Sequence, residues 1–193
     1  MKKLICLSAA VLMAGGVGTA FADTGAQVEV VGRVMATTCA ISATTGSQLH
    51  LPEVLPGEFK KAGDISSNAK GQIAINLTGC TKQDGTVAHY EGISLDGAAN
   101  SAQPTMFSNI ATAPLAVQVT NATPGAADAG TTGWKKVGDV VSKKDTALVQ
   151  KIASGTDIPD AIALFDVAMA STVATVQAGE KLDATLYFDY DYQ

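Results

Sequence analysis

Residues 182–193 close the chain with the sequence LDATLYFDYDYQ. Apolar and polar side chains alternate along it, which is the period-two pattern of a β-strand with one buried face. Chain termini are usually polar and frayed, so a terminal strand this apolar is either buried in a sheet or offered to a partner at a sheet edge. The residues on its apolar face are Leu182, Ala184, Leu186, Phe188, Tyr190 and Tyr192.

The rest of the chain predicts further short strands, of which residues 72–80 (QIAINLTGC) show the clearest alternation. Pro-Gly and Asp-Gly pairs, typical of turns, separate these strands and favour an all-β domain. Residues 43–71 are expected to be turn-rich, and residues 121–146 are expected to form a surface loop. The remaining predicted strands cover residues 26–34, 87–95, 115–120, 147–152 and 163–169.

The first 22 residues have the pattern of a secretory signal peptide. Lys2 and Lys3 precede an apolar stretch, and Ala20-Phe21-Ala22 matches an A-x-A cleavage site. Removing 22 of 193 residues leaves 171, and losing two of 13 basic residues against 18 acidic ones changes the net charge to −7. A single exported domain is therefore expected.

Two cysteines remain in the mature chain, because Cys6 leaves with the leader. An even pair in an exported chain predicts a disulfide between Cys39 and Cys80, which would close a loop of about 40 residues and stabilise the fold by about 4 kcal/mol. A zinc site would need two more ligands, and His50 and His89 lack ligand spacing. No metal and no cofactor is expected.

Composition and motifs disfavour several functions. A net-acidic chain with Arg33 as its single arginine is unlike a nucleic-acid-binding protein, and the mature chain has no apolar run of about 20 residues that would span a membrane. No G-x-S-x-G, H-E-x-x-H or phosphate-binding glycine loop is present, so an enzyme is not expected. The loop with Trp134, Lys135-Lys136 and Lys143-Lys144 is either an anion-binding patch or a solvated rim with Trp134 as a partly buried anchor, and the rim is favoured.

Three stretches together resemble the chaperone–usher fimbrial subunits (pilins) of Gram-negative bacteria, and in particular the major subunits of type 1 fimbriae. The first is residues 28–41, VEVVGRVMATTCAI, an alternating arm with Gly32 and a cysteine seven residues later. The second is residues 73–80, IAINLTGC, which matches the family's strand that ends in the second cysteine. The third is the tail, with Gly179 placed 14 residues before the last residue and Tyr192 as the penultimate one.

This resemblance implies an incomplete immunoglobulin-like sandwich that lacks its last strand. A strand donated by a chaperone or by a neighbouring subunit would complete it. Residues 1–22 would be the signal peptide, residues 23–33 the N-terminal donor arm, and residues 34–193 the pilin domain. The arm residues Val28, Val30 and Gly32 would enter the neighbour's groove, with the glycine in a shallow site where a side chain would clash.

The implied partners are a periplasmic fimbrial chaperone, an outer-membrane usher, and other copies of the chain or sister subunits in a head-to-tail polymer. The chaperone would bind the terminal carboxylate and pair with the last strand. The C-terminal residues assigned to this role are Gly179, Leu186, Phe188, Tyr190, Tyr192 and Gln193.

The implied function is that of a structural fimbrial subunit. It would be exported to the periplasm and would polymerise by donor-strand exchange into a cell-surface filament used in adhesion. Having both an arm and a groove favours a shaft or adaptor subunit. The alternative is a shaft subunit that itself binds a host receptor, for which the loop at residues 134–136 is the candidate site.

Overall fold

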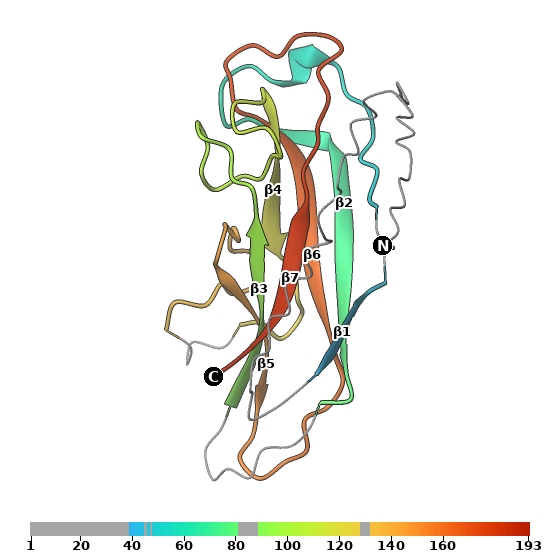
Figure 1. The fold of residues 1–193 in the computed structure, drawn as a ribbon, viewed down its shortest axis with the longest axis vertical. Helices are drawn as coiled ribbons and strands as arrows, with labels where there is room; N and C mark the ends of the chain where they lie inside the picture. The colour runs from blue at the N-terminus through green and yellow to red at the C-terminus, as the bar shows by residue number, and fades with distance from the viewer. Residues whose placement is uncertain (1–38, 45, 47, 81–88, 128–131) are drawn as a thin grey trace, which may run out of the picture. The chain divides into compact units, whose positions relative to one another are not determined.

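The computed structural model of the chain describes residues 39–44, 46, 48–80, 89–127 and 132–193 (Figure 1). The predicted strand at residues 26–34, the arm and the leader lie outside the described residues. The described residues contain seven β-strands, no α-helix, and one 3-10 helix, η1 (Pro56–Glu58). No helix among them is long and apolar enough to cross a membrane. The all-β prediction is confirmed.

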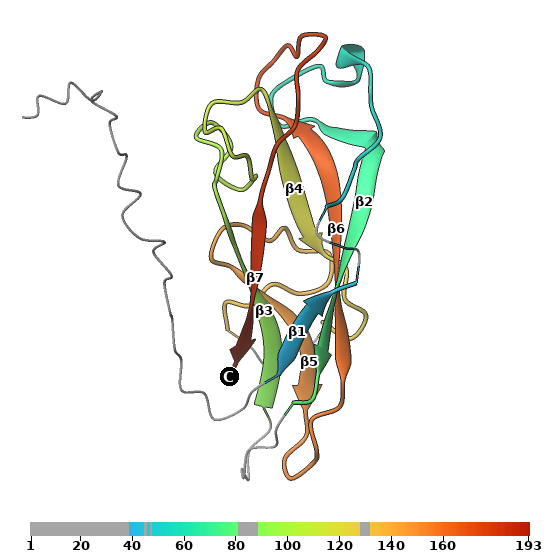
Figure 2. The ribbon, with the colours of Figure 1, turned by 45° about the vertical axis from the view of Figure 1, so that its right-hand side comes forward.

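The strands form two antiparallel sheets, seen as two layers when Figures 1 and 2 are compared. One sheet has four strands in the order β1-β2-β6-β4, and the other has three in the order β5-β3-β7. In chain order the strands are β1 (Ala40–Ala43), β2 (Ile65–Thr78), β3 (His89–Gly97), β4 (Leu115–Asn121), β5 (Thr146–Ile152), β6 (Ala161–Ser171) and β7 (Leu186–Tyr192).

Both sheets contribute side chains to one apolar core. Leu77 of β2 and Phe165 of β6 are fully buried, as is Ile93 of β3 in the other sheet. Alternate residues along the second half of β2 and along β6 point inward, so the period-two patterns in the sequence become one layer of the sandwich core. Each such large side chain contributes about 1.5–3 kcal/mol through its removal from water.

Several predicted boundaries change in the structure. β2 begins at Ile65, inside the stretch expected to be turn-rich, and its pairing with β6 shifts between Ile65 and Lys70. In that shift the Ser66 hydroxyl accepts the backbone N–H groups of Asn68 and Ala69, which explains why the local sequence lacks alternation. β1 was not predicted, and residues 182–185 precede the last strand rather than belong to it.

Candidate functional site

The last strand, β7, lies at the edge of the three-stranded sheet. It pairs with β3 from Leu186, opposite Gly97, to Tyr192, opposite Glu91. The ladder continues to Gln193, because Gln193 N–H donates to the Tyr90 carbonyl at 3.0 Å and Tyr90 N–H donates to a main-chain carboxylate oxygen of Gln193 at 2.8 Å. Among the described residues, no strand pairs with the other side of β7. That side therefore presents an edge of the kind that accepts another strand.

The inward side chains of β7, together with Leu182 and Ala184 just before it, form the apolar row that the sequence predicted. The ring of Phe188 lies 5.2 Å from that of Phe165 in the opposite sheet, and Tyr187 on the outer face is 61% exposed. Most of the row stays only partly buried although it packs against the main core. The members of the row are Leu182, Ala184, Leu186, Phe188, Tyr190 and Tyr192.

Tyr190 is fixed by a carboxylate that sequence reasoning missed. Its hydroxyl donates to Oε1 of Glu91 at 2.7 Å, and the side-chain amide of Gln150 donates to Oε2 at 2.6 Å. Glu91 is fully buried. Burying a carboxylate is costly unless hydrogen bonds satisfy it, so three strands are tied together at this point. No local pattern could have revealed it, because its partners lie 59 and 99 residues away in the sequence.

Tyr192, the penultimate residue, stacks on His89 with ring centroids 5.0 Å apart. Burial, and in second place the nearby charge of Glu91, raise the pKa of the Tyr192 hydroxyl. His89 thus packs in the sheet, and His50 is exposed. Neither histidine lies in a cluster of metal-ligating side chains among the described residues.

The predicted disulfide between Cys39 and Cys80 is present, with an S–S distance of 2.04 Å. It joins the residue before β1 to the second residue after β2. All four residues of β1 are exposed, including Ile41 at 37%, and within the described chain β1 pairs only with β2. β1 is therefore a second edge strand, in the opposite sheet from β7.

The two sulfurs and a Glu91 oxygen form a compact group whose ligand atoms all lie within 4.8 Å of one another. Two cysteines and a carboxylate are a common set of zinc ligands, but zinc binds thiolates. In a closed disulfide the two sulfurs are bonded to each other and neither carries the charge that a metal needs. The group is therefore a disulfide with a carboxylate beside it.

Two glycines shape the entry to β7. Gly179, predicted as part of the C-terminal region, lies in the preceding loop with φ +90° and open space around it, so its role is conformational. Gly97 of β3 lies where β7 begins, and a Cβ there would come within 2.7 Å of the Thr185 carbonyl oxygen and 2.9 Å of Phe107. The absence of a side chain at Gly97 allows the last strand to approach β3 closely.

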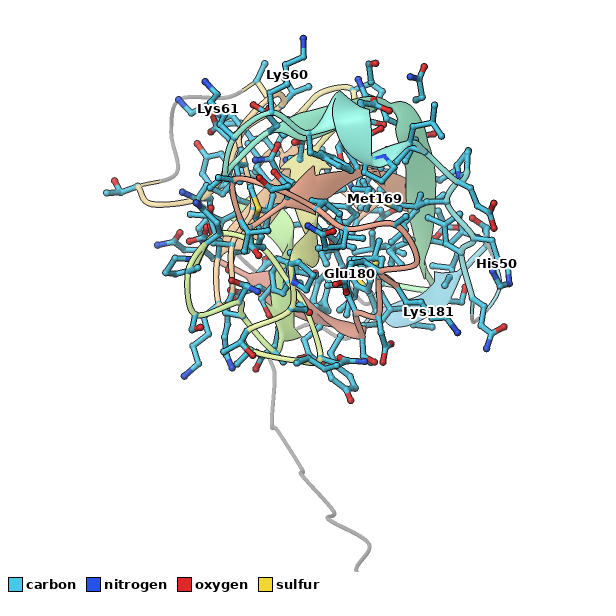
Figure 3. The ribbon with its side chains drawn as sticks, turned by 90° about the horizontal axis from the view of Figure 1, so that it is seen from above. His50, Lys60, Lys61, Met169, Glu180 and Lys181 are labelled. Atoms are coloured by element: carbon cyan, nitrogen blue, oxygen red, sulfur yellow. A yellow bond between two sulfur atoms is a disulfide. The ribbon has the colours of Figure 1, made fainter. Side chains whose placement is uncertain are left out.

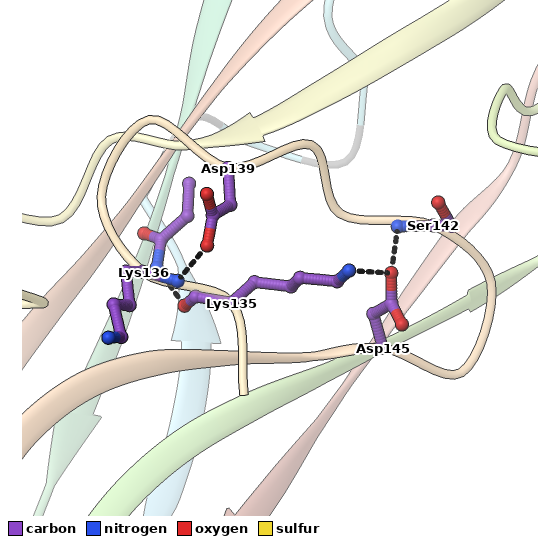
Figure 4. Close-up of polar contacts among 6 residues, drawn as sticks. Lys135, Lys136, Asp139, Ser142 and Asp145 are labelled. Atoms are coloured by element: carbon purple, nitrogen blue, oxygen red, sulfur yellow. Dashed lines mark hydrogen bonds and ion pairs between the residues drawn. The ribbon is translucent and has the colours of Figure 1, made fainter. Parts of the chain in front are cut away.

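Trp134 and Lys135 in the loop at residues 134–136 are held by contacts within the fold. A Cβ on Gly92 would come within 2.8 Å of the Trp134 ring, which shows how closely this partly buried ring covers β3. Lys135 pairs with Asp145 at 3.4 Å, and the backbone N–H of Lys136 donates to Asp139 at 2.8 Å (Figure 4). The favoured interpretation, with Trp134 as a loop anchor, fits this arrangement.

One member of the second lysine pair is also held by a carboxylate. Lys143 pairs with Asp96 at 3.6 Å.

At the η1 end of the molecule, Lys60 and Lys61 point outward, well apart from His50 at the periphery (Figure 3). These exposed cations are thus spread over separate regions.

The comparisons with known proteins agree with this geometry. The family model described as fimbrial protein matches residues 27–193. This range includes both cysteines, the glycine at position 179 and the whole of β7. No curated protein matches the chain.

Three solved structures are similar to the chain at 15% identity. A chaperone–usher pilus studied for rod uncoiling matches over 89% of this chain and 97% of its own, with a TM-score of 0.51. The P pilus rod subunit PapA matches over 86% and 99%, with a TM-score of 0.47. An antigen and type I fimbria protein of Burkholderia pseudomallei matches over 81% and 94%, with a TM-score of 0.39. The first likeness shows a shared fold and confirms the immunoglobulin-like sandwich.

Proposed function

The chain belongs to the fimbrial protein family and is a structural subunit of a surface filament. On that premise we propose that copies of this chain join one another or sister subunits by donor-strand exchange. The observation that carries this proposal is β7, with its apolar inward row, its second side open among the described residues, and its ladder running to the last residue. An added strand would pair with this side and cover the row.

The strand would come from residues 23–33 of the next copy or of a sister subunit. Val28 and Val30 would each bury an apolar side chain over the row, worth about 1.5–3 kcal/mol apiece, while backbone hydrogen bonds would align the strand. Gly32 would occupy a position too shallow for a side chain. Because donor and acceptor are different surfaces of one chain, the assembly grows as an open head-to-tail filament.

Before assembly, a periplasmic chaperone would supply the strand, and an outer-membrane usher would be the place of exchange. Export would depend on residues 1–22 as the signal peptide. The open edge of β7 supports this requirement, since an uncovered apolar edge strand is an aggregation hazard. The chaperone would contact the inward residues of β7 and the carboxylate of Gln193, which lies beside Tyr90 in the sheet.

Expression of residues 23–193 in the periplasm, with and without a cognate fimbrial chaperone, tests this mechanism. We expect aggregation or degradation of the chain alone and a soluble one-to-one complex with the chaperone. A stable monomer without any partner would contradict the open-edge mechanism.

A second experiment separates the donor arm from the acceptor edge. Deleting residues 23–33 is expected to preserve the chaperone complex and to stop the next step, the incorporation of the shortened chain into the growing filament. Val30→Ser should slow exchange, whereas Glu29→Ser, on the polar face of the same arm, is the matched control and should not. Normal filaments from the deletion variant would rule out the arm as donor.

A further inference from the structure

The buried carboxylate of Glu91 lies against the disulfide, and the polymerisation mechanism makes no use of it. Its Oε1 is 3.4 Å from Sγ of Cys39, and both sulfurs lie within 4.8 Å of its carboxylate group. The two cysteines are partly buried, whereas Glu91 is fully buried beside them. Any chemistry at this disulfide therefore takes place next to this side chain.

The hydrogen bonds around Glu91 satisfy both oxygens of its buried side chain. Each of its oxygens accepts from a donor, the Tyr190 hydroxyl on one and the Gln150 amide on the other. The third neighbour is a disulfide sulfur, which has no proton to donate, so the two donors to Glu91 are Tyr190 and Gln150.

Disulfide reduction by a thiol builds up negative charge at this place. An external thiolate, R–S⁻, attacks one cysteine sulfur, the S–S bond breaks, and the other cysteine leaves as a thiolate while R–S–S–Cys forms. In the transition state one negative charge is shared among three sulfurs in a row. Because both protein sulfurs lie within 4.8 Å of the carboxylate, the charges repel whichever sulfur is attacked, and burial strengthens the repulsion.

We propose that Glu91 protects the Cys39–Cys80 bond from thiol attack by electrostatic repulsion of the thiolates that reduction requires. The protection is kinetic, since it raises the barrier to exchange and does not depend on the geometry of the S–S bond. Glu91 acts here as a positioned charge, and Tyr190 and Gln150 hold it in place. The repulsion is the same whichever strand completes the sandwich.

The test compares reduction of the wild-type chain and of Glu91→Gln, both as the mature chain in its assembled form. The two reductants are cationic cysteamine and anionic mercaptoacetate, used at equal thiolate concentration. The rate of reduction is measured by alkylation and mass spectrometry and is divided by the rate for a small model disulfide. We expect wild type to favour the cationic thiol by about tenfold, and Glu91→Gln to lose this preference and to be reduced about tenfold faster by the anionic thiol.

Two controls separate charge from loosening of the fold. Asp166→Asn removes an exposed carboxylate on β6 that accepts from Gln72 of β2, and it should keep the wild-type rates with both thiols. Tyr190→Phe removes one hydrogen bond to Glu91 but leaves its carboxyl group beside the disulfide, so the preference for the cationic thiol should persist.

An equal acceleration with both thiols in Glu91→Gln would indicate opening of the fold and would overturn the proposal, as would identical rates in the two chains. If Glu91→Gln does not assemble, wild type alone decides. A wild-type chain that reacts equally with cationic and anionic thiols carries no such protection.

Discussion

The two ends of the sandwich each contain a bound carboxylate, and the two are held in different ways. Glu58, in η1, accepts hydrogen bonds from Ser66, Ser67 and Asn68, which follow it by eight to ten residues. Glu91, beside the disulfide, accepts from residues 59 and 99 positions away. The first network organises one loop, and the second joins three strands. A substitution at the η1 end should therefore disturb only its own loop, whereas a substitution at the disulfide end should lower the stability of the whole fold.

The largest expected effect comes from Cys80→Ser. The disulfide spans a sequence separation of 41, and its loss should lower the free energy of unfolding by about 4 kcal/mol, because the unfolded chain becomes less constrained. Denaturant unfolding of the purified chain, and its yield in an oxidising compartment, measure this effect. A midpoint equal to that of wild type would show that the disulfide end does not dominate stability.

Two glycines, one at each end, give the next test. A Cβ on Gly92 would come within 2.7 Å of Thr146, 2.8 Å of Trp134 and 2.9 Å of the Ala147 carbonyl oxygen, whereas one on Gly57 would meet nothing within 4 Å. Gly92→Ala should cost about 1–3 kcal/mol through overpacking, and Gly57→Ala should change stability by less than about 0.5 kcal/mol. Similar thermal midpoints for the two variants would contradict the expectation that Gly92 is tightly packed and Gly57 is not.

Alkaline pH should weaken the disulfide end selectively. The folded state raises the pKa of Tyr192 above its usual value near 10, first through burial and then through Glu91. The folded chain therefore holds this proton more firmly than the unfolded chain. Stability should be unaffected below pH 10 and should fall as pH rises through the folded pKa. Tyr192→Phe should remove the loss of stability that comes from ionisation of the Tyr192 hydroxyl, as measured by alkaline denaturation curves. A curve identical to that of wild type would contradict a role for this hydroxyl.

The smallest effect is expected at Glu58, whose pKa is lowered from 4.5 to about 2, above all by the Ser66 hydroxyl, with help from Ser67 and Asn68. Its contribution is present above pH 4.5 and is lost as pH falls from 4.5 towards 2. Glu58→Gln should speed hydrogen exchange at the amides of Ser67 and Asn68 and leave the β3–β7 ladder protected. The matched control is Glu53→Gln, and exchange spreading into β7 would contradict a local role.

Sequence patterns predicted the parts of the molecule that repeat every two residues. The alternation of residues 182–193 correctly placed Phe188, Tyr190 and Tyr192 inward and Tyr187 outward, and the cysteine count correctly predicted the bridge. These features depend on single-strand geometry and on export chemistry, which a sequence displays directly.

The features that the sequence did not reveal depend on contacts between distant residues. Glu91 looks like a polar position in a weak strand, and only the approach of Gln150 and Tyr190 explains its burial. The start of β2 was missed because Ser66 replaces ladder alternation with local hydrogen bonds. Gly92 gave no signal, since its small size matters only once Trp134 covers it.

The pairing of Gln193 with Tyr90 has a practical consequence for labelling. A purification tag or fluorescent fusion attached to the last residue would begin inside the β3–β7 ladder and would prolong an edge strand. Such an attachment would compete for the surface through which subunits are expected to join. The turn at residues 153–156 connects β5 to β6 and is exposed, so an inserted epitope there would leave the end of the chain in its native pairing.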